Sequence, residues 1–577
     1  MNGNNLLPTL LLTAGVFIFY GLFYRYHLGY QENFGLFLFT SEYAVETLSS
    51  PGGLAEYCSR FLTQFCFVPL VGAAVVALLL AVIHIQTVAI SRKITLRRGI
   101  MPLALAPSLC CVALLCDEQY LLTGITSLII VLAAVQLYLK IRAKSLRIIY
   151  LPLMAVALYA LTGVAAVVML IICIGVEMRR QAFRVREIWL LVGISVLIFS
   201  AFPFVAKHFF WQQYSLAKLF AGANYYRFTA VFPYPIILLW LLAAASPFIE
   251  FRPKRTLALV SCLVLAGITA FGVVGFADFK KEEVMRYDCL ARHRQWDAII
   301  RAADRHSPSS PLSVALLNLA LAKSNRLGDS MFRYYQNGVE GLMPTFVRDF
   351  TVPMVAGEIY YHTGFVNTAQ RYAFEAMEAI PDFQKSGRAL QRLAETNIIN
   401  GEYAVAQKYL RILRQTLFYR SWAEDAMACL LDEKLLASHQ EWMDLRRMRT
   451  RTDFLFSEGE KSQMLGLLLQ QDMHNRMAYE YLMAYCLLTK DLNHFRAYLS
   501  LGNELNYMAL PVHFQEALVY LWGLSNTSLA NIPYPISPDV MSRVNSYAAI
   551  YTSNPDAEKL LARDFSGSYW YYLHFRK

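Results

Sequence analysis

Charged residues are scarce in this chain of 577 residues, and the scarcity is uneven. Only 16% of the residues are charged, against roughly 25% in soluble proteins, whereas 56% are hydrophobic. Residues 1–276 are nearly all apolar, and residues 280–577 have the composition of a soluble helical protein. This contrast excludes a single soluble domain and predicts a membrane domain followed by a soluble one.

The sequence also lacks the short motifs of several common enzyme classes. It contains no nucleophile elbow, Walker loop, HExxH motif or dinucleotide-binding fingerprint. None of its ten cysteines forms a CxxC pair, so neither a zinc site nor a disulfide framework is indicated. The first five residues carry no basic charge, and no small-residue cleavage site follows the apolar run 6–24. We therefore expect this run to be a retained first span rather than a signal peptide.

The basic residues of the apolar half are gathered into four clusters, each just past an apolar run. They are Arg92, Lys93, Arg97 and Arg98; Lys140, Arg142, Lys144 and Arg147; Arg179, Arg180, Arg184 and Arg186; and Arg252, Lys254 and Arg255. Basic residues are retained on the cytoplasmic side of a bilayer, so these clusters predict the topology. These clusters hold more cations than the net charge of +11, so they account for the excess of positive charge in the chain. We therefore assign this excess to membrane orientation and anionic headgroups rather than to nucleic acid.

Apolar length predicts about nine spans. The expected ranges are 6–24, 66–90, 99–116, 119–139, 148–162, 163–178, 188–206, 232–250 and 256–276. The stretch 148–178 is longer than one span and has basic clusters at both ends, so we expect a hairpin that turns at Thr162-Gly163.

The odd number of spans sets the expected location of each half. The N-terminus would be cytoplasmic, residues 1–279 would form the transmembrane domain in a bacterial inner membrane, and residues 280–577 would lie in the periplasm. The fold class expected is therefore all-α, with a polytopic helical membrane domain followed by a helical repeat.

A repeat in the second half supports this expectation. Residues 364–372 (GFVNTAQRY) align with residues 401–409 (GEYAVAQKY) at an offset of 37, with weaker echoes near 296, 328 and 491. A glycine followed by a helix with a small residue and an aromatic resembles the tetratricopeptide (TPR) repeat, over roughly residues 285–500. Such α-solenoids carry a concave surface for a peptide or protein partner. A rigid helical cap without a ligand is the alternative.

Three carboxylates are expected at the outer membrane face. Glu32 follows the first span, and Asp117 and Glu118 form the turn between the third and fourth spans. A carboxylate so placed could act as a base, or bind a divalent cation that steadies a departing phosphate. Alternatively, Glu32 begins a surface amphipathic segment, and Asp117 and Glu118 interact with the dipole of the next helix.

The outward loop 207–231 contains cations among aromatic residues, against the usual depletion of cations in outward loops. The cations are Lys207, His208, Lys218 and Arg227. A lipid-linked phosphate would explain them, and ordinary lipid headgroups are the alternative.

This layout resembles the GT-C superfamily of multi-spanning glycosyltransferases that use polyprenyl-phosphate sugars. The similarity lies in Glu32 just past the first span, Asp117 and Glu118 at a second acidic site, and a soluble outer domain. The resemblance implies that Glu32 is a base or metal ligand, that Asp117 and Glu118 bind Mg²⁺ or Mn²⁺, and that a polyprenyl-phosphate carrier is the donor. The chain departs from the pattern in lacking a DxD motif, in having Glu for the frequent Asp, and in having few spans.

Three functions follow as hypotheses. The first is transfer of a sugar or oligosaccharide from a lipid carrier to a periplasmic acceptor. The second is a non-catalytic, membrane-anchored TPR scaffold for periplasmic proteins. A transporter or flippase subunit is disfavoured, because no charged residue lies mid-span and no pair of broken helices stands out. The whole chain is also similar to an uncharacterised family of bacterial polytopic membrane proteins with repeat-containing tails.

Overall fold

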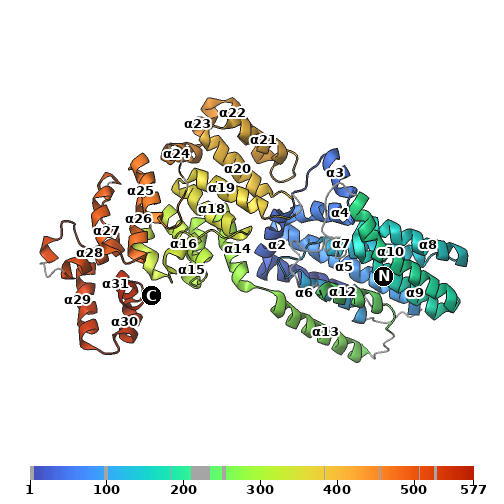
Figure 1. The fold of residues 1–577 in the computed structure, drawn as a ribbon. Helices are drawn as coiled ribbons and strands as arrows, with labels where there is room; N and C mark the ends of the chain where they lie inside the picture. Colours follow the sequence, from blue (N-terminus) through green and yellow to red (C-terminus); the bar gives the residue numbers. More distant parts are fainter. Residues whose placement is uncertain are drawn as a thin grey trace. The chain divides into compact units, whose positions relative to one another are not determined.

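A computed structural model describes residues 6–95, 102–181, 183–209, 234–249, 255–381, 384–451, 454, 456–505, 507–524 and 529–576. Every regular element in these ranges is a helix (Figure 1), so the all-α expectation is confirmed for the part of the chain described. The chain divides into two compact units. The first unit comprises Met1–Glu282, Ile380–Gly387 and Ile412–Ser421, and the second comprises Glu283–Ala379, Arg388–Arg411 and Trp422–Lys577.

The first unit contains the apolar helices, coloured blue to green in Figure 1. They are α1 (Leu6–Ile18), the π-helix η2 (Phe19–Phe23), α2 (Arg25–Gln31), the 3₁₀ helix η3 (Glu32–Phe34), α3 (Ser41–Leu48), α4 (Gly53–Thr63), η4 (Gln64–Phe67), α5 (Pro69–Thr95), η5 (Pro102–Leu105), α6 (Ala106–Leu114), α7 (Thr123–Tyr138), α8 (Lys144–Thr162), η6 (Gly163–Ala166), α9 (Val167–Arg180), α10 (Val185–Phe209), α12 (Tyr234–Ala245) and α13 (Arg255–Phe276). The helix α14 (Phe279–Arg292) begins in this unit and ends in the second.

Four segments of the described residues are long and apolar enough to cross a bilayer. They are Leu6–Phe23, Pro69–Thr95, Lys144–Arg180 and Thr256–Phe276, with shorter apolar helices at Pro102–Leu114, Thr123–Tyr138 and Pro235–Ala245. Large apolar side chains on α13 face outward, with Leu263 71% and Phe271 82% exposed. Such exposure is costly in water and is expected against lipid, so the structure supports membrane association. The count of nine spans remains a prediction.

The apolar stretch 148–178 reverses direction between α8 and α9, as the basic clusters at its two ends predicted. Arg147 near the start of α8 and Glu177 near the end of α9 pair at 2.6 Å between Nη1 and Oε1, which brings the two ends of the stretch together. The turn falls at Gly163, whose φ of 65° and ψ of −148° lie in a region that only glycine adopts readily. The expected hairpin at Thr162-Gly163 is therefore confirmed.

The segment between α1 and α5 folds over the ends of α7 and α8. The amide of Gly52 donates to the carbonyl of Ala160 at 2.9 Å, and the Thr126 hydroxyl donates to the carbonyl of Ala55 at 2.9 Å. The helix α4, the last short helix of this segment, is thus held against α7 and α8.

The second unit contains the remaining helices, coloured green to red in Figure 1. They are α15 (Trp296–Arg305), α16 (Pro311–Lys323), α17 (Leu327–Ser330), η7 (Met331–Arg333), η8 (Gly338–Gly341), α18 (Thr351–Thr363), α19 (Val366–Glu378), α20 (Gly387–Asn400), α21 (Tyr403–Leu413), α22 (Arg420–Leu431), α23 (Glu433–Ser438), α24 (Gln440–Met448), α25 (Lys461–Gln471), α26 (Arg476–Leu488), α27 (Leu492–Tyr498), η9 (Leu499–Leu505), α28 (Val512–Leu524), η10 (Leu529–Asn531), α29 (Pro538–Ser553), α30 (Ala557–Phe565) and α31 (Tyr569–Phe575).

The two matching motifs of the sequence occupy matching places in this unit. Gly364 lies in the turn between α18 and α19, Gly401 lies in the turn between α20 and α21, and both have positive φ. The small residues Ala369 and Ala406 that follow are fully buried, which lets the paired helices approach closely. The repeat motif therefore marks helix–glycine–helix units, while a TPR solenoid over 285–500 remains a prediction.

Candidate functional site

Three distant parts of the chain meet at one end of the first unit. The Tyr24 hydroxyl donates to the carbonyl of Cys116 at 3.2 Å, and the Gln31 side-chain amide donates to the carbonyl of Tyr120 at 2.9 Å. Lys281 binds the Glu118 carboxylate at 2.6 Å. Residues 24–32, 116–120 and 278–282 thus lie together, in a region that we call the acidic end.

A carboxylate fixes the start of α2 at this end. The backbone amides of Tyr26 and His27 donate to the two carboxylate oxygens of Glu282, each at 2.8 Å. The first amides of a helix have no partner within the helix, and negative charge is favoured at that terminus. Glu282 therefore holds α2 in place and, through it, the residues that follow.

Glu32 begins the short helix η3 that follows α2, and its side chain is buried rather than solvent-exposed. The residue is only 4% exposed. The hydroxyl of Tyr419 donates to its Oε2 at 3.1 Å. Burial of an ionised carboxylate is costly without hydrogen bonds, so this contact helps to hold Glu32 in the interior of the first unit.

Three buried side chains in the same stretch carry acceptor atoms that have no hydrogen-bond partner among the described residues. The atoms are Nε2 of His27, Oε1 of Gln31 and Oδ1 of Asn33, each on a residue that is 2% exposed. The amide nitrogens of Gln31 and Asn33 face the carbonyls of Tyr120 and Tyr30, which fixes their orientation and leaves the oxygens unpartnered. The stretch that carries Glu32 is therefore rich in acceptors.

His27 is neutral in this setting. Burial and the positive charge of Lys281 together outweigh a hydrogen bond to the Leu115 carbonyl and lower the pKa of His27 to about 4. An imidazole that donates one N–H to a carbonyl carries a lone pair on its other nitrogen. His27 therefore adds another acceptor and no charge to the acidic end.

Asp117 and Glu118 lie at the acidic end, and each already has a partner within the protein. Asp117 accepts a hydrogen bond from the Gln119 amide at 2.9 Å, and burial raises the pKa of Asp117. Glu118 is paired with Lys281. Among the described residues, no group of three or more His, Cys, Asp and Glu side chains could hold a metal ion. The expected Mg²⁺ or Mn²⁺ site at these two carboxylates stays a prediction.

The expected phosphate-binding cations are only partly described. Lys207 and His208 lie in the last turn of α10 with exposed side chains. Lys218 and Arg227 lie outside the described residues.

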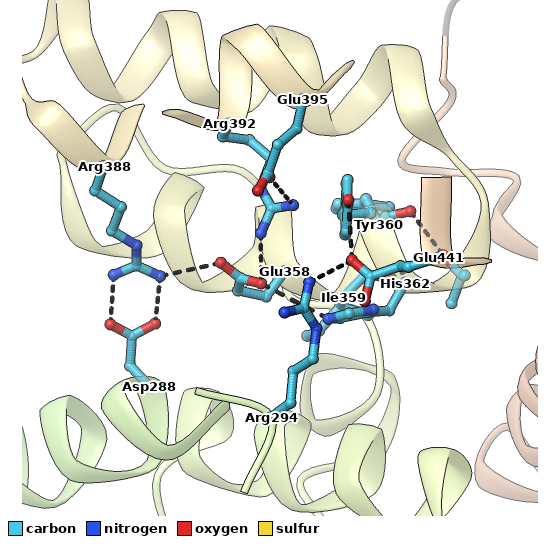
Figure 2. Close-up of polar contacts among 12 residues, drawn as sticks. Asp288, Arg294, Glu358, Ile359, Tyr360, His362, Arg388, Arg392, Glu395 and Glu441 are labelled. Atoms are coloured by element: carbon cyan, nitrogen blue, oxygen red, sulfur yellow. Dashed lines mark hydrogen bonds and ion pairs between the residues drawn. The ribbon is translucent and has the colours of Figure 1, made fainter. Parts of the chain in front are cut away.

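Figure 2 shows a buried ion network in the second unit that the sequence analysis did not predict. Arg388 on α20 makes two bonds to Asp288 on α14, at 2.5 and 2.7 Å, and reaches Glu358 on α18 at 3.4 Å. Arg392, one turn further along α20, binds Glu358 at 2.7 Å and Glu395 at 2.8 Å. Charges of opposite sign thus alternate across three helices, in a place where an unpaired charge would be very costly.

The ion network continues toward the surface. The guanidinium of Arg392 lies 3.6 Å from the centre of the Tyr361 ring, whose hydroxyl donates to Oε1 of Glu441 at 3.0 Å. The same oxygen accepts from Arg294 at 2.5 Å, and Arg294 is half exposed. The network therefore joins the buried pair on α14 to the outer helix α24.

The pKa values of two buried glutamates in the network, Glu358 and Glu395, are shifted in opposite directions. Burial opposes ionisation of Glu358, but Arg392 and Arg388 outweigh it and lower the pKa of Glu358 to about 2. Burial raises the pKa of Glu395 to about 7, although Arg392 favours its ionised form. Burial also lowers the pKa of His362 to about 3, so this histidine is neutral. One signal in the sequence could have indicated the network: Arg388, Arg392 and Glu395 recur at helical spacing on one face of α20.

Comparison with known proteins identifies the family of this chain but no similar curated protein or solved structure. No curated protein and no solved structure shows significant similarity to this chain. Residues 3–576 match a family of unknown function, DUF6057, so both units belong to the family pattern. The chain is therefore a member of the DUF6057 family of unknown function.

Proposed function

We propose that this protein is a membrane-embedded glycosyltransferase with Glu32 as its base. It would move a sugar or oligosaccharide from a polyprenyl-phosphate carrier to a periplasmic acceptor. The observation that carries the proposal is the burial of Glu32 in a stretch with three unpartnered acceptor atoms.

A hydroxyl-rich ligand suits these acceptors. A buried acceptor without a partner costs about 1–3 kcal/mol, and a sugar hydroxyl recovers that cost by donating to it. His27 Nε2, Gln31 Oε1 and Asn33 Oδ1 are all acceptors, so they favour a donor-rich ligand over an anion. Glu32 would take the proton of the attacking hydroxyl, which is the usual work of a carboxylate base.

The proposed orientation has the N-terminus inside, nine spans and residues 280–577 outside. Contacts within the first unit support it, because segments expected on the same side meet one another. Lys144 pairs with Glu187 at 2.8 Å, joining two basic clusters. The loop after α1, the turn at 116–120 and residues 278–282 meet at the acidic end, and no described member of the four basic clusters takes part in these contacts. This separation is the pattern that charge asymmetry across a bilayer produces.

The remaining roles follow from the same proposal. Asp117 and Glu118 would bind a divalent cation, for which Lys281 must leave Glu118. Lys207, His208, Lys218 and Arg227 would bind the phosphate of the lipid carrier.

The test is replacement of Glu32 by glutamine in a deletion strain, with Glu42→Gln as the matched control. Glu42 lies in the same loop, in the first turn of α3, and is exposed. Loss of a catalytic base should lower transfer by about 10²–10⁴-fold, measured by mass spectrometry of glycolipids and glycoproteins. Equal glycan profiles in the deletion strain and the parent would refute the proposed function.

A non-catalytic scaffold for periplasmic proteins is the second candidate. The helix–glycine–helix units at Gly364 and Gly401 and the buried ion network favour it, because they give the second unit a fixed shape suited to a protein partner. Full complementation by Glu32→Gln, together with failure of variants that unfold the second unit, would select the scaffold.

A further inference from the structure

Two loops from the second half of the chain belong to the first unit and lie against the segment that follows Glu32. The amide of Leu36 donates to the carbonyl of Lys385 at 2.9 Å, and the amide of Phe39 donates to the carbonyl of Gln415 at 2.8 Å. Residues 384–387 and 412–421 are therefore hydrogen-bonded to the extended backbone between η3 and α3. We call these two loops the strap.

Aromatic contacts fasten the strap beside Glu32. The ring of Phe418 stacks on that of Phe67, with centroids 5.1 Å apart and planes 17° apart. The Tyr419 ring meets Phe67 edge-on at 5.4 Å, and Phe418 meets Phe65 edge-on at 6.0 Å. Such contacts add about 0.5–1.5 kcal/mol each beyond the burial of apolar area.

Local structure sets the position of Tyr419. The Thr416 hydroxyl donates to the Leu413 carbonyl at 2.7 Å and accepts from the Tyr419 amide at 3.2 Å, which closes a turn. The ring of Tyr419 lies directly over Gly387, where a Cβ atom would come within 2.4 Å of it. Both loops of the strap thus hold the tyrosine, and its hydroxyl reaches Glu32.

We infer that the strap is a gate over Glu32 and that Tyr419 is its positioning residue. The inference rests on the proposed role of Glu32 and adds regulation to that site. With the strap closed, the Tyr419 hydroxyl occupies Oε2 and the side chain is buried. An acceptor hydroxyl reaches the carboxylate only when the strap lifts and Tyr419 releases it. Access to the base is therefore coupled to segments that belong in sequence to the helical repeat.

A reversible cross-link tests the gate. Phe39 and Gln415 are both exposed, and the hydrogen bond from the Phe39 amide to the Gln415 carbonyl at 2.8 Å makes these two residues neighbours, so a disulfide between cysteines at the two positions is a direct test of this contact. The double variant F39C/Q415C in the full-length membrane protein should form a disulfide, detected by peptide mass spectrometry. Transfer should then fall at least tenfold and return on reduction, whereas the single variants F39C and Q415C should be unaffected.

Each outcome has a distinct meaning. If no disulfide forms in native membranes, the strap is refuted whatever the protein does. If it forms and transfer continues unchanged, the strap need not open and the gate is refuted. If the deletion strain shows no glycan defect but the disulfide forms, the proposed function fails while the strap stands.

The positioning role of Tyr419 has a separate readout. Tyr419→Phe keeps the ring contact with Phe67 and removes the hydrogen bond from the Tyr419 hydroxyl to Oε2 of Glu32. The acid limb of the pH–rate profile for transfer should move to higher pH, because the Glu32 carboxylate loses a donor that favours its ionised form. Tyr403→Phe, at an exposed tyrosine outside the strap, is the control. An unchanged acid limb would show that the Tyr419 hydroxyl does not hold the Glu32 carboxylate in the closed state.

Discussion

Replacing Arg388 by methionine should destabilise the second unit by about 3–5 kcal/mol, the usual cost of stranding one partner of a buried ion pair. Arg388 and Asp288 are each about 5% exposed in their side chains and share two bonds, at 2.5 and 2.7 Å. Methionine fills similar volume without charge, so the loss reports the carboxylate left behind.

Proton uptake by the stranded carboxyl gives a stability loss of similar size and makes this loss depend on pH. The stranded carboxyl can take up a proton, and for an ordinary carboxyl pKa near 4 this costs about 4 kcal/mol at pH 7. The same step costs only about 1.4 kcal/mol at pH 5. The deficit of the variant relative to the parent should therefore shrink by about 2–3 kcal/mol between pH 7 and pH 5.

The measurement is urea unfolding of the purified full-length protein in detergent. Pulsed thiol labelling of Cys486, which is 1% exposed on α26, would report opening of the second unit by mass spectrometry. Arg371→Met is the control, because Arg371 pairs with Glu375 at 3.8 Å on the exposed surface and should matter by less than about 1 kcal/mol. A loss no larger than that of the control, or one independent of pH, would refute the view that the ion network is buried and coupled.

Two further predictions concern pH and topology. Burial raises the pKa of Glu395 to about 7, above its ordinary value of 4.5, so the folded state holds this proton more tightly than the unfolded chain. Its contribution to stability is complete below pH 4.5 and is lost as pH rises to about 7, and Glu395→Gln should remove about 3 kcal/mol of that pH dependence in urea titrations. A parent whose stability is flat from pH 5 to 8 would contradict this assignment. An alkaline phosphatase reporter fused after Lys577 should be active in a bacterial host, since the chain is expected to end outside. Activity of a cytosolic reporter alone at that position would overturn the orientation.

Sequence patterns predicted the features that depend on residues close together in the chain. The reversal within 148–178 followed from the length of this stretch and from the basic residues at both ends, and the Arg147–Glu177 pair confirms it. The repeated motifs located Gly364 and Gly401 in turns between paired helices. Both inferences rest on local rules: the cost of carrying charge across lipid and the need for positive φ in a tight turn.

The sequence by itself determined that this protein is helical, that its first half is apolar enough for a membrane, and that a repeat lies in its second half. Hydrophobic length, charge asymmetry and glycine spacing depend on residues close together in the sequence, so they can be recognised without knowing any tertiary contact. Only the tertiary structure decided that Glu32 is buried against Tyr419, 387 residues away, and that Arg388 neutralises Asp288, 100 residues away. Many arginines and tyrosines could have satisfied those carboxylates, and the path of the backbone through space selects which one does.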